Sequence, residues 1–301
     1  MGYKSKAYLF LIIGAVISGI AGPVIKLTLN VLPVEAFLFY RFFISTLLVI
    51  FLLPFAKLQI PRKPSVLLRF LLYCFLNATV ALGFLFLGAA KTTLLNLSLL
   101  TIISPLLTIF AGYILLHERI SKKLKIGVLI AFIGSFIILV GPFLATGDNV
   151  GKVSGNIFVI LSVLASVYCT ILVKRLLRSG VDPLTLTNTS FVIGFISFLI
   201  IILFNGNFLN TITIIKNLPL QYHFGVLYMA ILSGTFAYYI GNLAQRSIDV
   251  SKAAPFAYIP AVISSILAIA LLHDPIIPEI IIGTIVIFVG VYVAETRRKM
   301  L

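Results

Sequence analysis

The chain has 301 residues, of which 61% are hydrophobic and 10% are charged, and its formal net charge is +15. A soluble domain is typically about half apolar and a quarter charged, so this composition excludes an ordinary water-soluble fold. Its basic residues lie in short gaps between apolar runs of about 20 residues, which indicates a lipid bilayer rather than nucleic acid as the partner.

The apolar runs predict an all-α integral membrane protein with ten transmembrane helices, because each run is long enough to cross the bilayer core. The first run is too long for the apolar region of a signal peptide, and we interpret it as a helix that stays in the protein. Breaker residues and charges separate the runs. In chain order the predicted helices are 7–28, 34–55, 66–88, 93–116, 124–143, 153–175, 184–204, 222–245, 252–272 and 277–295.

The distribution of Lys and Arg predicts that both termini are cytoplasmic. With the N-terminus inside, the outer loops hold Lys91, Lys152 and Lys216, and Lys26 and Arg41 lie within helices. The remaining basic residues then all lie in inner segments, as the positive-inside rule requires. We therefore expect a multi-pass protein of the cell (plasma) membrane.

A repeated segment divides the chain into two halves. The stretch "LLHERISKKLKIG" returns as "LLHDPIIPEIIIG", and His117 and His273 are 156 positions apart. We predict two repeats, at residues 1–145 and 150–298, with five helices each. An odd number of helices inverts the second repeat in the membrane, an architecture that recurs in secondary transporters. Both stretches are expected to be turns in water between two helices, so Glu118 is interpreted as a loop residue.

The segments "FLFYRFFIS", "SPLLTIFAGYILLHERISKKLKIGVLIAFIGSFIIL" and "AYYIGNLAQRSIDVSKAAPF" carry a family resemblance. They resemble the drug/metabolite transporter superfamily, in its ten-helix EamA-type branch. The resemblance implies a central cavity between the repeats, opened alternately to each side. It also implies the movement of small organic metabolites, such as amino acids and related compounds, often outward. The chain has no Trp, and Gly241 stands where such transporters often carry one.

Arg41 is the first candidate for a substrate-binding residue. It lies about seven residues into the second predicted helix, and a charge within a membrane helix costs about 2.5–3.5 kcal/mol on insertion scales. One interpretation is a guanidinium that faces the cavity and attracts a carboxylate or phosphate. The alternative is a side chain that extends to the outer headgroups, which would also account for Lys26.

Polar side chains within the other helices extend this candidate site. Each could contact a substrate, and each could equally bond a neighbouring helix. Those selected as further candidates for substrate binding are Asn77, Tyr168, Asn188, Tyr239, Asn242 and Tyr258.

Proline and glycine positions predict shape. Pro105 and Pro260 fall within predicted helices 4 and 9, where a proline bends a helix, and they are candidate gating points. Gly127 and Gly134 are one heptad apart, as are Gly283 and Gly290, which predicts close helix contact between the halves or between two copies of the chain. A homodimer is therefore one of the two arrangements that the glycine spacing allows.

No sequence feature indicates a cofactor, a metal site or direct use of ATP. The chain lacks a phosphate-binding G-x-x-x-x-G-K-[ST] loop, and none of its acids falls clearly at mid-membrane depth, so proton coupling is not assigned. Two alternatives to a transporter are a membrane-embedded enzyme that acts on lipids, and a channel or scaffold. An enzyme would need acid–base or metal groups at one depth, whereas His117 and His273 fall on opposite faces. We expect no enzymatic activity.

Overall fold

The computed structural model describes residues 3–52, 58–92, 97, 100–146, 153–272 and 278–295, and within these residues the chain is helical without strands. The first half contains α1 (Tyr3–Leu29), α2 (Val34–Leu52), α3 (Pro64–Phe75), α4 (Leu82–Lys91), α6 (Ser104–Leu116) and α7 (Lys122–Thr146). The second half contains α8 (Val153–Arg178), α9 (Pro183–Phe204), α10 (Phe208–Lys216), α11 (Leu220–Leu227), α12 (Ala237–Ser247), α13 (Val250–Ala253), α14 (Ile259–Leu272) and α15 (Pro278–Glu295).

Short segments of non-α helix join six of these helices in pairs. A π-helical segment, η1 (Leu76–Ala81), joins α3 to α4, and a second, η2 (Tyr228–Phe236), joins α11 to α12. A 3₁₀ segment, η3 (Ala254–Tyr258), joins α13 to α14. The two π segments overlap when the halves are superposed at the 156-residue spacing, and π turns inside α-helices are frequent at functional sites.

Six helical segments in the described part are long and apolar enough to cross a membrane: Ser5–Leu29, Val34–Leu52, Pro64–Lys91, Val153–Arg178, Pro183–Phe204 and Leu220–Ser247. They coincide with predicted helices 1, 2, 3, 6, 7 and 8. Two shorter apolar helices, Ser104–Leu116 and Ile281–Ala294, fall in predicted helices 4 and 10. The all-helical membrane class is thereby confirmed, and the total of ten crossings stays a prediction.

The structure of the segment between predicted helices 7 and 8 differs from the prediction. We expected a loop there, and the structure has α10 at Phe208–Lys216. Phe208, Ile214 and Ile215 pack against the buried cluster that includes Phe39 and Leu218, and this packing stabilises a helix too short to be stable alone. The first half of predicted helix 4 and the turn at His273 lie largely outside the described residues.

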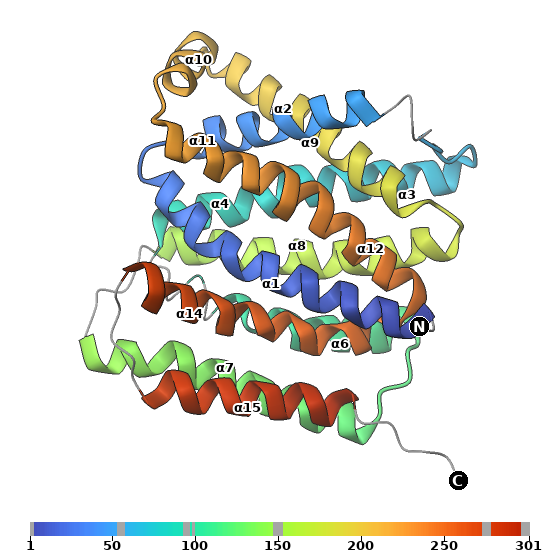
Figure 1. The fold of residues 1–301 in the computed structure, drawn as a ribbon. Coiled ribbons are helices and arrows are strands. Elements are labelled where there is room, and N and C mark those ends of the chain that lie inside the picture. Colours follow the sequence, from blue (N-terminus) through green and yellow to red (C-terminus); the bar gives the residue numbers. More distant parts are fainter. Residues whose placement is uncertain are drawn as a thin grey trace.

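The helices lie side by side in a bundle (Figure 1). α1 packs against α12 and α14, whereas α8 packs against α4 and α6. α2 pairs with α9, and α7 pairs with α15 at the opposite edge of the bundle. Exchanging the two halves leaves this list of contacts unchanged, because each contact has its counterpart in the other half.

The α7–α15 pair is built on the glycines that the sequence pointed to. A Cβ on Gly127 would lie 2.5 Å from the carbonyl oxygen of Gly290, and one on Gly134 would lie 2.8 Å from that of Gly283. The backbones approach so closely that no side chain fits between them. The predicted close contact is confirmed, and here it joins the two halves of one chain.

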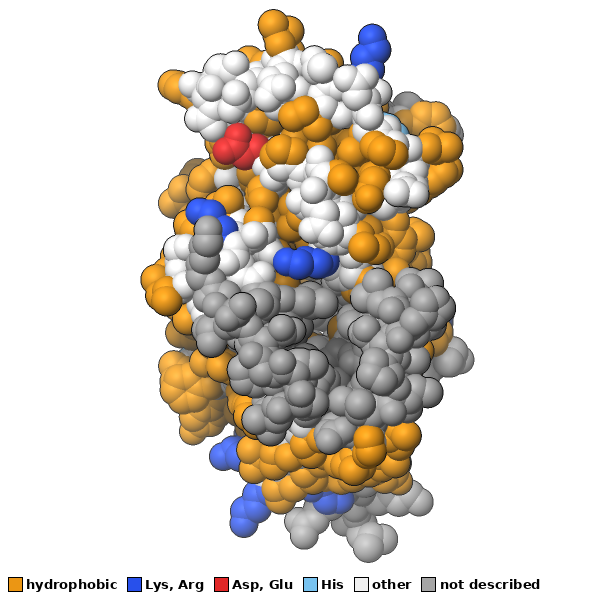
Figure 2. Space-filling view, turned by 90° about the vertical axis from the view of Figure 1, so that its left-hand side faces the viewer, with side chains coloured by type: hydrophobic (Ala, Val, Ile, Leu, Met, Phe, Trp, Pro, Cys, Tyr) orange, Lys and Arg blue, Asp and Glu red, His pale blue; other side chains and the backbone are white. Residues whose placement is uncertain are grey.

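Large apolar side chains cover the outside of the bundle. Phe51, Phe110 and Tyr292 are each more than half exposed, like many others on the flanks. In the end-on view of Figure 2, hydrophobic side chains lie along the edges of the molecule. A soluble monomer rarely exposes so much contiguous apolar surface, so these flanks fit lipid.

Candidate functional site

Arg41 is the most buried charged group of the candidate site. Its side chain is 1% exposed, although it belongs to a helix whose opposite side carries exposed apolar residues. The guanidinium carbon lies 5.6 Å from the centre of the Phe42 ring and 5.9 Å from that of the Phe86 ring. A desolvated cation over aromatic faces gains about 2 kcal/mol or more, which offsets part of its burial cost. The interpretation of Arg41 as a side chain that extends to the headgroups is therefore wrong.

Two nitrogens of Arg41, Nε and Nη1, are buried and have no hydrogen-bond partner among the described residues. A guanidinium has five N–H donors and ordinarily satisfies them with carboxylates or carbonyls. The one glutamate on the same helix, Glu35, instead accepts hydrogen bonds from Asn205 Nδ2 at 3.3 and 3.2 Å. Arg41 thus combines a buried positive charge with free donors.

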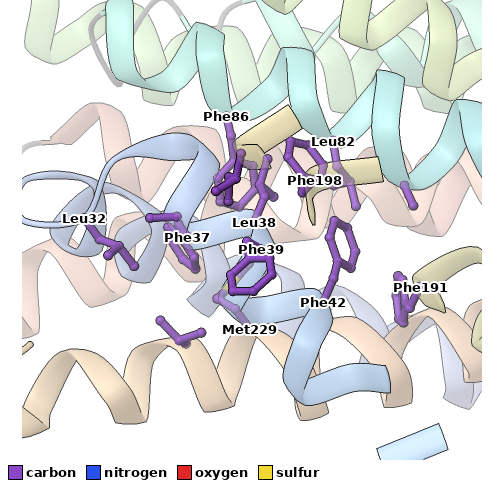
Figure 3. Packing of buried hydrophobic residues seen from close by; sticks show 14 of the residues in the cluster. Leu32, Phe37, Leu38, Phe39, Phe42, Leu82, Phe86, Phe191, Phe198 and Met229 are labelled. Atoms are coloured by element: carbon purple, nitrogen blue, oxygen red, sulfur yellow. The ribbon is translucent and has the colours of Figure 1, made fainter. Parts of the chain in front are cut away.

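The aromatic residues around Arg41 come from its own helix, α2, and from α4 and α9. Figure 3 shows Phe42, Phe86, Phe198 and Phe191 in one buried cluster with Leu38. The Phe42 and Phe198 rings stack at 5.9 Å. These rings leave the guanidinium in surroundings of low polarity, where its attraction for an anion is much stronger than in water.

The π segment η2 lies against the charged end of Arg41. A Cβ built on Gly234 would lie 3.6 Å from Arg41 Nη2 and 3.6 Å from the Phe191 ring. Tyr238, one turn later, meets Phe191 edge-on at 5.5 Å and is close enough to interact electrostatically with Arg41. The backbone of η2 at Gly234 therefore lies next to the guanidinium. Tyr238 was not among the residues predicted from the sequence to bind substrate.

Three of the selected amides are buried near this position, on α9, η1 and α12. Asn77 Nδ2 donates to Ser190 Oγ at 3.1 Å, and Asn242 Nδ2 donates to Thr187 Oγ1 at 3.0 Å. Asn188 is 2% exposed, and its Oδ1 has no partner among the described residues. Asn77 and Asn242 thus connect helices, whereas Asn188 keeps a free acceptor.

The three selected tyrosines are not brought into this group. Tyr168 is 43% exposed and shares one side of α8 with the exposed Leu161 and Leu164. Tyr258 is buried in a different cluster, with Val128 of α7 and Ile287 of α15, and its hydroxyl lacks a partner in the described part of the chain. Tyr239 is half-buried and directed about 100° away from Tyr238 around the axis of α12.

Both selected prolines start a helix. Pro105 is the second residue of α6 and Pro260 is the second residue of α14. A backbone N–H in the first turn of an α-helix has no acceptor within that helix, so a proline at this position costs no intrahelical hydrogen bond. Neither proline lies deep within a regular α-helical segment, and whether they bend their helices stays a prediction. Each instead follows a non-α turn, Ile102–Ile103 or η3, and their role in gating stays a prediction.

Glu118 lies in the predicted turn after α6, but its side chain is buried in the protein and not in water. It is 6% exposed, and its carboxylate accepts hydrogen bonds from the backbone N–H groups of Val250 and Ser251, at 2.9 and 2.8 Å. These groups are the free donors at the start of α13, so Glu118 caps that helix from another part of the chain. His117 before it has a positive φ of 54° and ends α6.

The described residues were also compared with what a second binding site or a metal site would require. A cleft of about 160 Å³ lies at one end of the bundle and is lined by Gln59, Arg62, Lys63 and Ser179 among others, away from Arg41. Among the described residues, no three His, Cys, Asp or Glu side chains are grouped as a metal site would require.

Comparison with known proteins agrees with this architecture. A solved crystal structure of a protein superposes with a TM-score of 0.74 at 16% identity, covering 97% of this chain and 96% of that one, which shows the fold alone. The uncharacterized transporter YyaM of Bacillus subtilis (strain 168) is 25% identical over 210 residues, which is 70% of this chain and 67% of YyaM. An uncharacterized transporter of Archaeoglobus fulgidus is 26% identical over 98% of this chain and 99% of its own length.

The model of the EamA-like transporter family matches residues 5–140 and again 153–296, so that it accounts for nearly the whole chain. This agrees with the resemblance read from the sequence. Together with the apolar helices, these matches establish that the chain is a multi-pass membrane transporter that belongs to the EamA-like transporter family.

Proposed function

We propose that the chain is a secondary transporter that exports small organic metabolites bearing a carboxylate, such as amino acids or related compounds. In this proposal ten helices form two inverted repeats, residues 1–145 and 150–298, with both termini in the cytoplasm. Substrate moves by alternating access through a space between the repeats.

The observation that carries this proposal is the buried guanidinium of Arg41 with two unpartnered nitrogens. A buried charge without a counterion is costly, and removal from water also strengthens its attraction for an anion. A substrate carboxylate could accept two parallel hydrogen bonds from the guanidinium, a geometry that lysine cannot reproduce. The free Oδ1 of Asn188 would accept a donor such as an amino group.

The contacts between the halves support alternating access. α1 of the first half packs on α12 and α14 of the second, and α8 of the second packs on α4 and α6 of the first. A structure with two equivalent sets of contacts can exchange them with little net change in energy, as alternating access requires.

The first step of the test identifies the metabolites that the transporter exports. Medium from cells that express the chain is compared with medium from cells that do not, and compounds enriched outside are then used as labelled substrates in proteoliposomes. Arg41→Ala should reduce their transport at least tenfold, because a hydrogen bond to a charged group contributes about 1.5–3 kcal/mol. Arg41→Lys should recover only part of it.

The matched control is Arg119→Ala, which removes an exposed arginine and should leave transport unchanged. All variants are compared at equal amounts of monodisperse protein. Undiminished transport of a carboxylate by Arg41→Ala would contradict the proposed role of Arg41. Enrichment only of compounds without an anionic group would contradict the substrate class.

A further inference from the structure

Two lysines make the same contact in the two halves of the chain. Lys26 Nζ donates to the backbone carbonyl oxygens of Ala89 and Thr92, at 3.3 and 3.5 Å. Lys174 Nζ donates to those of Gln245 and Ile248, both at 2.5 Å. Ala89 and Gln245 are 156 positions apart, as are Thr92 and Ile248, which is also the spacing of the repeated His117 stretch.

The lysines themselves also correspond. Lys26 is the last residue of "AVISGIAGPVIK" on α1, and Lys174 is the last of "VLASVYCTILVK" on α8. Each lies near the C-terminal end of its own helix and reaches the C-terminal end of another, α4 or α12. The last carbonyls of a helix lack partners within the helix and carry partial negative charge, so an ammonium group binds them well.

The two contacts cross between different groups of helices. We name α1, α12 and α14 group A, because α1 packs on the other two, and α4, α6 and α8 group B, because α8 packs on the other two. The side chain of Lys26, on α1 of group A, contacts the end of α4 in group B. The side chain of Lys174, on α8 of group B, contacts the end of α12 in group A. Each lysine therefore joins the two groups.

The contacts lie at opposite ends of the bundle. In Figure 1 the chain enters α1 at the end marked N, and α12 finishes beside it, whereas α4 and the C-terminal end of α1 lie at the other end. The Lys174 contact is thus at the N-terminal end of α1, and the Lys26 contact is at its far end. At the Lys174 end, Glu118, which follows α6 of group B, also binds the start of α13, the short helix between α12 and α14 of group A.

Both contacts suit reversible opening. The acceptors are carbonyl groups rather than carboxylates, so a broken contact leaves no unpaired counterion behind. A lysine near a helix end can extend its ammonium group to water, which limits the cost of breaking the contact. Among the described residues, neither Nζ forms an ion pair within 4.0 Å.

We propose that Lys26 and Lys174 are paired latches between groups A and B, and that the transport cycle breaks one while the other stays formed. The latches rest on the alternating access of the proposed function. By the predicted topology, Lys26 holds the outer end closed and Lys174 the inner end. Loss of one latch should shift the population of the transporter toward the state open at that end.

The experiment measures the two ends separately, without a substrate. Cys74 and Cys169 are replaced by alanine, and Thr92→Cys or Ile248→Cys is introduced as a reporter, since both positions are 5% exposed and belong to the latches. Membrane-impermeant maleimide is applied to cells for Thr92→Cys and to inside-out vesicles for Ile248→Cys. Each reporter is combined with Lys26→Met and with Lys174→Met.

Lys26→Met should accelerate labelling of the Thr92→Cys reporter and slow that of the Ile248→Cys reporter, and Lys174→Met should do the opposite. The expected change is about tenfold, the effect on an equilibrium constant of losing one charge-assisted hydrogen bond. The double variant Lys26→Met/Lys174→Met should return both labelling rates toward those of the parent, because the bias is balanced again. Lys174→Arg, which keeps the donors, and Lys123→Met, at an exposed position, should match the parent.

A purely structural role would not give opposite changes at the two ends. Faster labelling of both reporters in either single variant would indicate unfolding and overturn the proposal, as would labelling that changes at neither end. Substrate counterflow by the parent protein is measured in the same preparations. If the parent protein is active and the lysine variants label like the parent, the latches alone are refuted. If the parent protein is inactive and the lysine variants show opposite labelling changes at the two ends, the proposed substrates are contradicted and the latches are supported.

Discussion

Glu118 Oε2 accepts a hydrogen bond of 2.8 Å from the backbone nitrogen of Ser251, so the segment after α6 is tied to the start of α13 across 133 positions of the chain. Val250 donates to the other carboxylate oxygen at 2.9 Å. A carboxylate that caps a helix satisfies buried N–H groups and also interacts favourably with the positive end of the helix dipole.

Glu118→Ala should lower the stability of the folded protein by about 1.5–3 kcal/mol, the typical contribution of hydrogen bonds to a charged group. Glu118→Gln keeps one acceptor and should lose less. Stability is measured in detergent by the temperature at which a thiol-reactive dye reaches the buried Cys74 and Cys169. Arg119→Ala, at an exposed neighbouring position, is the control. Equal unfolding temperatures for Glu118→Ala and the control would refute the cap.

The glycine contact between α7 and α15 gives a second prediction. A Cβ at Gly290 would lie 2.4 Å from the backbone nitrogen of Ala131, whereas one at Gly241 meets nothing within 4 Å. Gly290→Ala should therefore force the helices apart and destabilise the protein by about 1–3 kcal/mol. Gly241→Ala makes the same chemical change on a helix and should be tolerated. Folded protein is quantified for both by size-exclusion chromatography, and equal recovery would contradict the close approach.

Asn188 and Asn242 should respond differently to alanine. Asn242 donates to Thr187, so Asn242→Ala should reduce stability by about 0.6 kcal/mol, the average for such bonds between membrane helices. The Oδ1 of Asn188 has no partner in the described structure, so Asn188→Ala should leave stability nearly unchanged and raise the apparent KM for the substrate. Unfolding temperature and transport kinetics measured on the same samples separate the two effects. A loss of stability in Asn188→Ala with an unchanged KM would remove it from the site.

Orientation in the membrane can be tested by cysteine labelling in the background that lacks Cys74 and Cys169. Reporters at Lys63 and Lys123 should react with an impermeant maleimide only in inside-out vesicles, and a reporter at Asp148 should react in intact cells. The basis is the positive-inside rule, since basic residues concentrate in the segments assigned to the cytoplasm. Labelling of the Asp148 reporter from the cytoplasmic side alone would overturn the predicted topology.

The sequence predicted those properties that depend on short stretches of chain. Predicted helices 1, 2, 3, 6, 7 and 8 agree with six apolar helices of the structure, because the length and apolar character of a span are local quantities. The heptad spacing of Gly127 and Gly134, and of Gly283 and Gly290, is also a local quantity, and it pointed to close packing. Helix α10 was missed because its stability depends on contact with the buried cluster rather than on its own nine residues.

By itself the sequence determined the membrane class and the family, and it singled out Arg41 as a candidate, because a charge within a membrane span is costly. Only the tertiary structure decided which polar groups meet. It placed Gly234 and Tyr238 beside Arg41, left Tyr168 on an exposed side of α8, and buried Glu118 against α13. Local pattern shows that a helix has a polar position. The neighbour it meets depends on how helices distant in sequence pack, which no local pattern records.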